Sequence, residues 1–346
     1  MIGFAWLQSR TQTLVAAGAL AVVAVVTAIT GPHLVHVYDT SVATCQAHGD
    51  CPAATNGFLQ VDHTLSNWLN ALVITVPGIL GIFWGVPLAA RELETGTYRL
   101  AWTQSVSRTR WLAVKLGVVG LVSMATAGLL SLAVTWWSSP IDRVSATAFA
   151  SFAQRDIVPL GYAAFAFALG ATAGLIIRRS LPAMASTMVV FVLVRLAFDE
   201  DVRPHLISPV VKKFALSFGG FGIHNGGPPT VQPNLPNLPG AWVTSIQMVN
   251  RAGQALTTRI VEAACPNLNL PPALGSGPGT GRGTAPVGGN PLEACATKLA
   301  PIYHEVVTYQ PANRYWAFQW YELAIYLAAA IVLGGLCVWW IRHRLS

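Results

Sequence analysis

The residues of this chain that could act on a partner are concentrated in one polar segment, residues 91–110, between two long apolar stretches. Its leucines and Trp102 can face a bilayer or a helix bundle, while Glu92, Glu94 and Arg99 can face water. This pattern predicts a short amphipathic helix followed by a turn. Such a segment, held by a membrane helix at each end, is suited to receive a push from a soluble partner. The same pattern also fits an interfacial loop that has no partner.

Four cysteines make up the second set of candidate residues. Cys45 and Cys51 lie after the first apolar stretch, and Cys265 and Cys295 lie in a longer polar segment after the fifth. In the orientation argued below, all four are on the oxidising side of the membrane, where disulfides persist. We predict the bridges Cys45–Cys51 and Cys265–Cys295, with four free thiols as the alternative. Cys337 lies inside the last apolar stretch.

Motifs for catalysis, cofactors and nucleic acid are weak. Residues 275–284 are rich in glycine but lack the lysine of a phosphate-binding loop and follow no predicted strand. The segment after the first apolar stretch contains His33, His36, His48 and His63. A His-x-x-His pair could bind zinc, but surface histidines without a ligand role are commoner. We predict no catalytic residue, no metal site and no cofactor in this chain, and the scattered basic residues favour no nucleic-acid partner.

Six apolar stretches position these segments. They cover residues 13–30, 69–90, 111–137, 160–177, 181–198 and 323–341. A hydrocarbon core of about 30 Å needs roughly 20 helical residues, and a backbone in lipid must satisfy its own hydrogen bonds. Charged residues are only 10% of the chain, against roughly 25% in soluble domains. The chain is therefore predicted to be an all-α integral membrane protein with six transmembrane helices, the first an uncleaved span rather than a signal peptide.

The positions of Lys and Arg predict the orientation. With the N-terminus inside, the cytoplasmic segments carry Arg10, Arg91, Arg99, Arg108, Arg110, Arg178, Arg179, Arg342 and Arg344. Residues 31–68, the first outer loop, contain no Lys or Arg, and each Arg in the second outer loop lies beside an Asp. Short-loop basic bias sets topology, so we predict both termini on the cytoplasmic side.

The longest polar segment, residues 199–320, is too long to be a plain loop. Residues 204–217 and 241–265 have helix-compatible composition, and the apolar residues of the second fall at mixed helical spacing. The Gly- and Pro-rich residues between and after them indicate turns or coil. We predict a small extracellular domain stapled by the Cys265–Cys295 bridge. The parts are then residues 1–198 with five spans and the coupling segment, 199–320, and 321–346 with the last span and a cytoplasmic tail.

Within the spans, Gly170 and Gly174 form a small-xxx-small pattern that permits close helix approach. Arg195 lies near the outer end of the fifth span, where it can meet Asp199 or Glu200. The spans show no paired ionisable residues deep in the apolar stretches, which argues against an intramembrane enzyme.

Three motifs carry a family resemblance. The core Glu-Leu-Glu-Thr-Gly-Thr at residues 92–97, with residues 103–108 and Lys115, resembles the intracellular coupling region of ABC transporter permeases of the type-2 exporter class. Residues 99–105, 309–320 and 335–342 are similar to actinobacterial members. The resemblance extends over essentially all six predicted helices.

The resemblance implies a plasma-membrane permease subunit of a bacterial exporter that pairs with a second permease copy and with two cytoplasmic ABC ATPase subunits, which bind ATP and Mg. It assigns the ATPase contact to Glu92, Glu94, Gly96, Thr97 and Arg99. Alternating access would then be driven by closure of the ATPase dimer.

The resemblance also places the substrate path on the second and fifth helices. The candidate path residues are Phe83, Trp84, Met184, Met188 and Phe191. Their apolar character favours a hydrophobic or amphipathic substrate, although any lipid-facing helix has similar composition. Besides membrane lipids, an extracellular protein is a candidate partner. The alternative function is a non-transporting sensor or assembly module that binds a ligand or protein through its extracellular domain.

Overall fold

The computed structural model of the chain describes residues 2–47, 51–95, 108–145, 147–222, 230–233, 236, 238–266 and 291–344. The chain divides into two compact units, and each is described by itself. Unit 1 comprises Met1–Ile207 and Tyr315–Ser346, and unit 2 comprises Ser208–Arg314.

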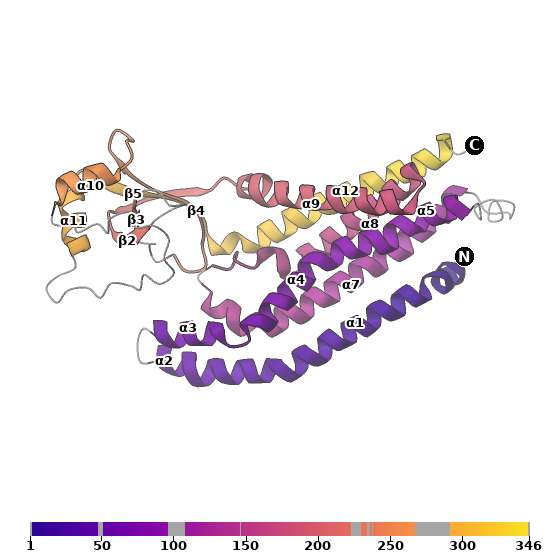
Figure 1. The fold of residues 1–346 in the computed structure, drawn as a ribbon, viewed down its shortest axis with the longest axis horizontal. Coiled ribbons are helices and arrows are strands. Elements are labelled where there is room, and N and C mark those ends of the chain that lie inside the picture. The colour runs from indigo at the N-terminus through magenta and orange to yellow at the C-terminus, as the bar shows by residue number, and fades with distance from the viewer. Residues whose placement is uncertain are drawn as a thin grey trace. The chain divides into compact units, whose positions relative to one another are not determined.

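Unit 1 is helical (Figure 1). Its α-helices are α1 (Ile2–Val37), α2 (Thr44–Gln46), α3 (Pro52–Gln60), α4 (His63–Leu80), α5 (Val86–Thr95), α7 (Arg108–Val144), α8 (Val158–Ile177), α9 (Ser180–Ala197) and α12 (Tyr315–Arg344). Wider π-helical turns extend or join them at η1 (Tyr38–Ala43), η2 (Gly81–Gly85) and η4 (Phe198–Val202), and tighter 3-10 turns lie at η3 (Phe152–Gln154) and η5 (Arg203–His205). A further 3-10 turn, η6 (Ala312–Arg314), closes unit 2 just before α12.

Among the described residues, six helical segments are long and apolar enough to cross a membrane. They are Gln12–Gln46, His63–Leu88, Leu112–Val144, Val158–Ile177, Ser180–His205 and Ala312–His343. The six predicted spans are therefore confirmed as helices. The first and third extend well beyond the predicted residues 13–30 and 111–137, because polar residues at their ends continue the helix instead of ending it.

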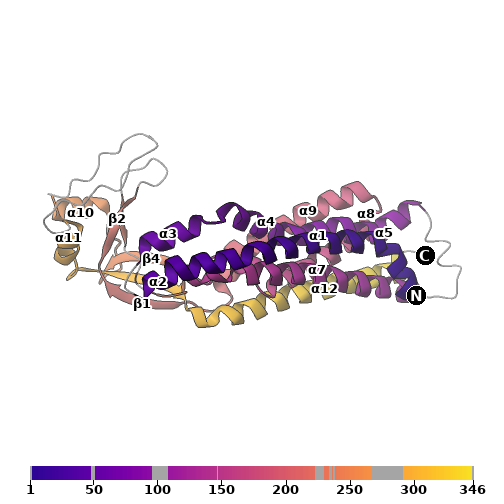
Figure 2. The ribbon, with the colours of Figure 1, turned by 90° about the horizontal axis from the view of Figure 1, so that it is seen from below.

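Helix α8 is the centre of unit 1 (Figures 1 and 2). It packs against α4, α5, α7, α9 and α12, and most of its side chains are buried. Its sequence is rich in alanine and glycine, so neighbouring helices can approach its backbone closely. The two ends of unit 1 are named here by their helices: the α5 end, where α1 also begins and α12 ends, and the opposite α3 end (Figure 1).

The closest helix contact in unit 1 joins α8 to the second span. A Cβ atom on Gly170 would lie 2.1 Å from the carbonyl oxygen of Gly81, and one on Gly174 would lie 2.5 Å from that of Val86. The small-xxx-small pattern therefore does bring two backbones together, as its spacing predicted. Because no side chain separates them, α8 and the segment from η2 to α5 are in direct backbone contact.

Exposed aromatic side chains lie at two levels along α12. Trp320 and Tyr321 are exposed near its start, and Trp339 is exposed near its end. Trp339 follows Trp320 by 19 residues, which is a rise of about 28 Å in an α-helix. This matches a hydrocarbon thickness of about 30 Å, and aromatic belts are typical of membrane interfaces. Exposed Trp68 of α4 lies with the first level, at the α3 end.

Unit 2 contains a three-stranded antiparallel sheet in the order β1–β5–β4 and a separate two-stranded hairpin. The sheet strands are β1 (Val210–Ala215), β4 (Trp242–Asn250) and β5 (Tyr303–Gln310), and the hairpin strands are β2 (Phe218–Gly222) and β3 (Thr230–Pro233). Helices α10 (Thr258–Ala264) and α11 (Pro291–Leu299) complete it. The prediction of an all-α chain is therefore wrong for this unit.

The sequence misled about β4 because the strand contains a bulge. Val243 pairs with Tyr309 and Ile246 pairs with Val307, with the register shifting between Val243 and Ser245. Tyr309 and Val307 are buried on the same face of β5, so the bulge places Val243 and Ile246 on one face although they are three residues apart. That spacing imitates a helix, and residues 241–265 were expected to be helical.

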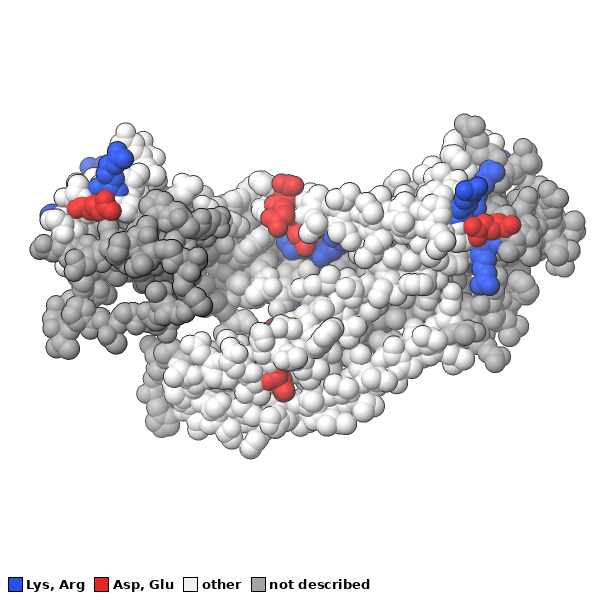
Figure 3. All heavy atoms as spheres, viewed as in Figure 1, with Lys and Arg blue, Asp and Glu red and all other residues white. Residues whose placement is uncertain are grey.

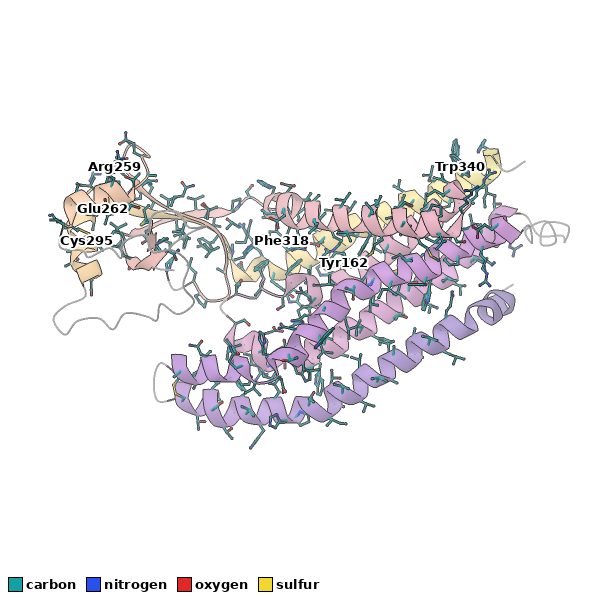
Figure 4. The ribbon with its side chains drawn as sticks, in the orientation of Figure 1. Tyr162, Arg259, Glu262, Cys295, Phe318 and Trp340 are labelled. Atoms are coloured by element: carbon teal, nitrogen blue, oxygen red, sulfur yellow. A yellow bond between two sulfur atoms is a disulfide. The ribbon has the colours of Figure 1, made fainter. Side chains whose placement is uncertain are left out.

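Both predicted disulfides are present. Cys45 pairs with Cys51 across a Cα–Cα distance of 6.0 Å, and Cys265 pairs with Cys295 across 5.9 Å. Figure 4 labels Cys295, which is buried in the helical layer of unit 2 with Val261 and Leu299. The second bridge therefore joins α11 to the end of α10.

The Gly170 contact predicts a stability effect. We expect Gly170→Ala to destabilise unit 1 by roughly 2 kcal/mol, because the added methyl group meets a backbone oxygen that cannot rotate away. Thermal unfolding of the purified protein in detergent measures this change. Gly117→Ala is the matched control, since a Cβ there has nothing within 4 Å; an equal loss in both variants would contradict the close contact.

The contribution of Glu305 to the stability of unit 2 should depend on pH. Its buried carboxylate accepts the Ser217 N–H at 2.8 Å, and burial raises its pKa. A raised folded-state pKa means that its stabilising contribution is present at low pH and is lost as pH rises through that pKa. We expect Glu305→Gln to raise the melting temperature at pH 7 and to have little effect near pH 4. A loss of stability at pH 7 would contradict this.

Candidate functional site

At the start of the predicted coupling segment, Glu94 of α5 contacts the first residue of α9. Glu94, in the last turn of α5, accepts hydrogen bonds from the N–H and Oγ of Ser180 at 2.9 Å and 2.5 Å. Ser180 is the first residue of α9, and the first N–H groups of a helix have no partner within the helix. Glu94 therefore caps α9 from another helix.

The electrostatics of this contact keep Glu94 charged. The hydroxyl and N–H of Ser180 lower the pKa of Glu94, and the nearby charge of Arg179 lowers it further. The carboxylate is therefore ionised at neutral pH, and the contact weakens only when the pH falls through this lowered pKa. Exposed arginines at the same end of unit 1 are Arg91, Arg110, Arg178, Arg179 and Arg342, and Figure 3 shows a group of basic and acidic side chains there.

The other predicted coupling residues are only partly described. Glu92 lies in α5, but its side chain is outside the described part. Gly96, Thr97 and Arg99 also lie outside the described residues. The described parts of the predicted segment 91–110 are its first residues, up to Thr95 at the end of α5, and its last, from Arg108 at the start of α7.

The predicted substrate-path residues do not share one surface. Phe191 is buried, and its ring would lie 3.2 Å from a Cβ on Gly78 of the second span. Trp84 is buried on another side, in a cluster with residues of α7 and α8. Phe83 and Met188 are exposed, and Met184 is partly buried against Ala183. The second and fifth spans are adjacent, as the resemblance implied, but these five side chains are not brought together.

The strongest polar feature of the bundle is a buried charge cluster that the sequence reasoning found only in part. We define the charge cluster as Tyr162, Arg195, Asp199, Arg203 and Glu322. The predicted pairing of Arg195 with Asp199 is present at 3.4 Å. Glu322 is fully buried, and it lies 3.5 Å from Arg195 as well.

Arg203 is the best-satisfied cation of the charge cluster. Its Nε donates to Glu322 Oε2 at 2.8 Å, and its Nη2 donates to Glu322 Oε1 at 2.9 Å. The same Nη2 reaches Asp199 at 2.6 Å, and the Tyr162 hydroxyl donates to Glu322. This is the bidentate arginine–carboxylate geometry of strong ion pairs.

Three helices position the charge cluster at the α3-end half of the bundle. Tyr162 comes from α8 (Figure 4), Arg195 from α9, and Glu322 from α12. Arg203 follows α9 in η5. Glu322 carried a signal, because an acid in a long apolar helix needs a buried partner. The predicted apolar stretch began at residue 323, so this glutamate lay just before it and was assigned no role.

A second polar junction holds the connection between α7 and α8. Arg155 donates to Asp142 at 3.1 Å and to Asn70 of α4 at 2.8 Å. Asp156 accepts the Tyr315 hydroxyl at 2.6 Å. Within the described residues, no group of three or more His, Cys, Asp or Glu side chains could hold a metal ion.

The charge cluster predicts a large effect of removing its buried acid. Glu322→Gln leaves two buried arginines with one carboxylate, so we expect a loss of about 3 kcal/mol in the free energy of unfolding. Detergent-phase thermal unfolding measures it. Glu200→Gln, an exposed carboxyl on η4, should change stability by less than about 0.5 kcal/mol. Equal melting temperatures for Glu322→Gln and the wild type would contradict the stabilising role of the charge cluster.

Comparison with known proteins gives one match. The family model described as ABC-2 membrane transporter related matches residues 17–203, which is more than half of the chain. The matched residues cover the first five of the six candidate spans, except for the start of the first span and the end of the fifth. No curated protein and no solved structure matches the chain. With six helices of membrane length, this match shows that the chain is a multi-pass membrane permease that belongs to the ABC-2 membrane transporter related family.

Proposed function

We propose that the chain is the membrane subunit of an ABC exporter, paired with a second copy of itself and driven by two cytoplasmic ATPase subunits that bind ATP and Mg. The observation that carries this proposal is the Glu94–Ser180 contact. It ties the helix that enters the predicted coupling segment to the start of another membrane span.

The contact gives a mechanical route from the coupling segment to the spans. A force applied to residues 96–107 acts first on α5 and α7, which flank them. From α5 it passes to α9 through Glu94 and to α8 through the backbone contact at Gly174. Since packed backbones transmit displacement rather than absorb it, these helices would move together when the ATPase closes.

The distribution of charge supports placing the α5 end in the cytoplasm. The α5 end carries the exposed arginines named above. At the α3 end, Arg155 and Arg203 are paired with acids, and the Cys45–Cys51 bridge lies at this end too. An excess of Lys and Arg is typical of the cytoplasmic side, and disulfides are typical of the opposite side. The plasma membrane of a bacterium is the proposed location.

The proposed cargo is hydrophobic or amphipathic. Exposed apolar residues dominate the spans, and the described path candidates are apolar. Unit 2 remains the proposed extracellular domain, a candidate surface for a further protein partner.

The experiment separates binding of the ATPase from coupling to it. The chain is co-expressed with a candidate ABC ATPase subunit; co-purification of the ATPase is measured in detergent, and ATP-driven transport of lipophilic dyes is measured in proteoliposomes. We expect Glu92→Ala with Gly96→Pro to abolish co-purification. Ser180→Ala leaves the five predicted contact residues unchanged and should retain the ATPase. Both Ser180→Ala and Glu94→Gln should lower transport per ATP hydrolysed by about tenfold, because the tie between α9 and α5 is weakened.

Glu200→Gln is the control, since this exposed carboxyl lies on η4 at the opposite end of the fifth span. Retained ATPase binding in the Glu92→Ala, Gly96→Pro variant would contradict the coupling assignment. A wild-type ratio of transport to hydrolysis in both Glu94→Gln and Ser180→Ala would contradict the mechanical route.

A further inference from the structure

The two arginines of the charge cluster compete for the same two carboxylates. Arg203 holds Glu322 at 2.8 and 2.9 Å and Asp199 at 2.6 Å. Arg195 reaches the same two groups only at 3.5 and 3.4 Å. Among the described residues, Nη1 of Arg195 makes no hydrogen bond although it is buried. A buried donor without an acceptor costs free energy, so the cluster is satisfied on one side only.

Each guanidinium also has its own aromatic platform. The guanidinium carbon of Arg195 lies 3.6 Å from the ring centre of Tyr162, and that of Arg203 lies 4.8 Å from the ring centre of Phe152. Cation–π contacts of this kind hold an arginine in place without a carboxylate. Either arginine can therefore stay in the protein while the other takes Glu322.

A π-helical turn lies between the two arginines along the chain. Arg195 is in α9, and Arg203 follows directly after η4 (Phe198–Val202). A π turn holds one residue more than an α turn, and π turns are frequent at functional sites. Rewinding η4 to α-helix would rotate Arg203 by about 100° around the helix axis, while Arg195 upstream stays in place.

We propose that the charge cluster is a two-position switch in which Glu322 passes from Arg203 to Arg195 when η4 rewinds. The exchange keeps the buried charges of Glu322, Arg195 and Arg203 paired, with the half-buried Asp199 as the second carboxylate, so it avoids the cost of isolating one of them. It also gives Nη1 of Arg195 the hydrogen bond that it lacks.

The position of the switch in the chain indicates what it responds to. Unit 2 begins at Ser208, soon after Arg203, and ends at Arg314, shortly before Glu322. A pull on the first connection of unit 2 therefore acts on Arg203, and a pull on the second acts on Glu322. The switch would couple events in unit 2 to the register of α9, with or without an ATPase, so it goes beyond the proposed exporter function.

The test measures the distance between η4 and α12 in the permease alone. Spin labels are attached at Val202→Cys and Trp320→Cys, both exposed positions, in a Cys337→Ser background, and pulsed electron–electron double resonance is recorded in nanodiscs. We expect the wild type to show mainly one distance with a minor second one. Arg203→Gln should raise the second population at least tenfold relative to the first, and Arg195→Gln should abolish it.

The controls separate switching from loss of structure. Arg203→Lys keeps the charge but loses the bidentate grip, so it should give an intermediate shift even if Arg203→Gln does not fold. Glu200→Gln should leave the distribution unchanged. Identical distributions in wild type, Arg203→Lys and Arg195→Gln would overturn the switch, as would equal shifts in both arginine variants. Because no ATPase is present, failure of the exporter assignment would not affect the result.

Discussion

The contact on which the rest of the structure depends is the one between α8 and the second span, where two backbones meet without side chains between them. Gly170 and Gly81 leave no room for a Cβ, and Gly174 meets the first turn of α5 in the same way. Helices in lipid gain no hydrophobic energy from association, so close packing of this kind supplies much of their attraction. The contact fixes the second span against the central helix and thereby sets where α5 ends and where Glu94 lies.

The two ends of unit 1 use polar contacts of different strength. At the α5 end, Glu94 and Ser180 meet at an exposed site, where a hydrogen bond to a charged group contributes modestly and can be broken and remade. At the other end, the charge cluster buries the charges of Arg195, Arg203 and Glu322, so removing one partner is far more costly than weakening a surface pair. A bundle built in this way can change at the α5 end while its opposite end stays assembled or exchanges partners internally.

The spans and the disulfides could be predicted from the sequence because their signals are local. In lipid, the backbone of a long apolar stretch satisfies its hydrogen bonds by forming a helix. The close approach of α8 to a neighbouring helix at Gly170 followed from the spacing of Gly170 and Gly174. The fold of unit 2 could not be predicted, since a bulge at Val243 gave a strand the apolar spacing of a helix. The charge cluster was only half visible, because its partners come from helices far apart in sequence, and Glu322 lies more than a hundred residues after Arg203. Arg195 and Asp199 were found because they are neighbours on one helix.

An inserted domain creates a physical problem that the charge cluster addresses. Unit 2 leaves the bundle after η5 and returns at the start of α12, so both connections attach where two helices would otherwise be free to separate. Helices α9 and α12 both pack on α8, and apolar packing alone is non-directional. The Arg203–Glu322 pair is directional, with two parallel hydrogen bonds that fix the two helices in one register. Because Arg195 can offer the same carboxylate a second donor, that register is one of two that the same buried charges can satisfy.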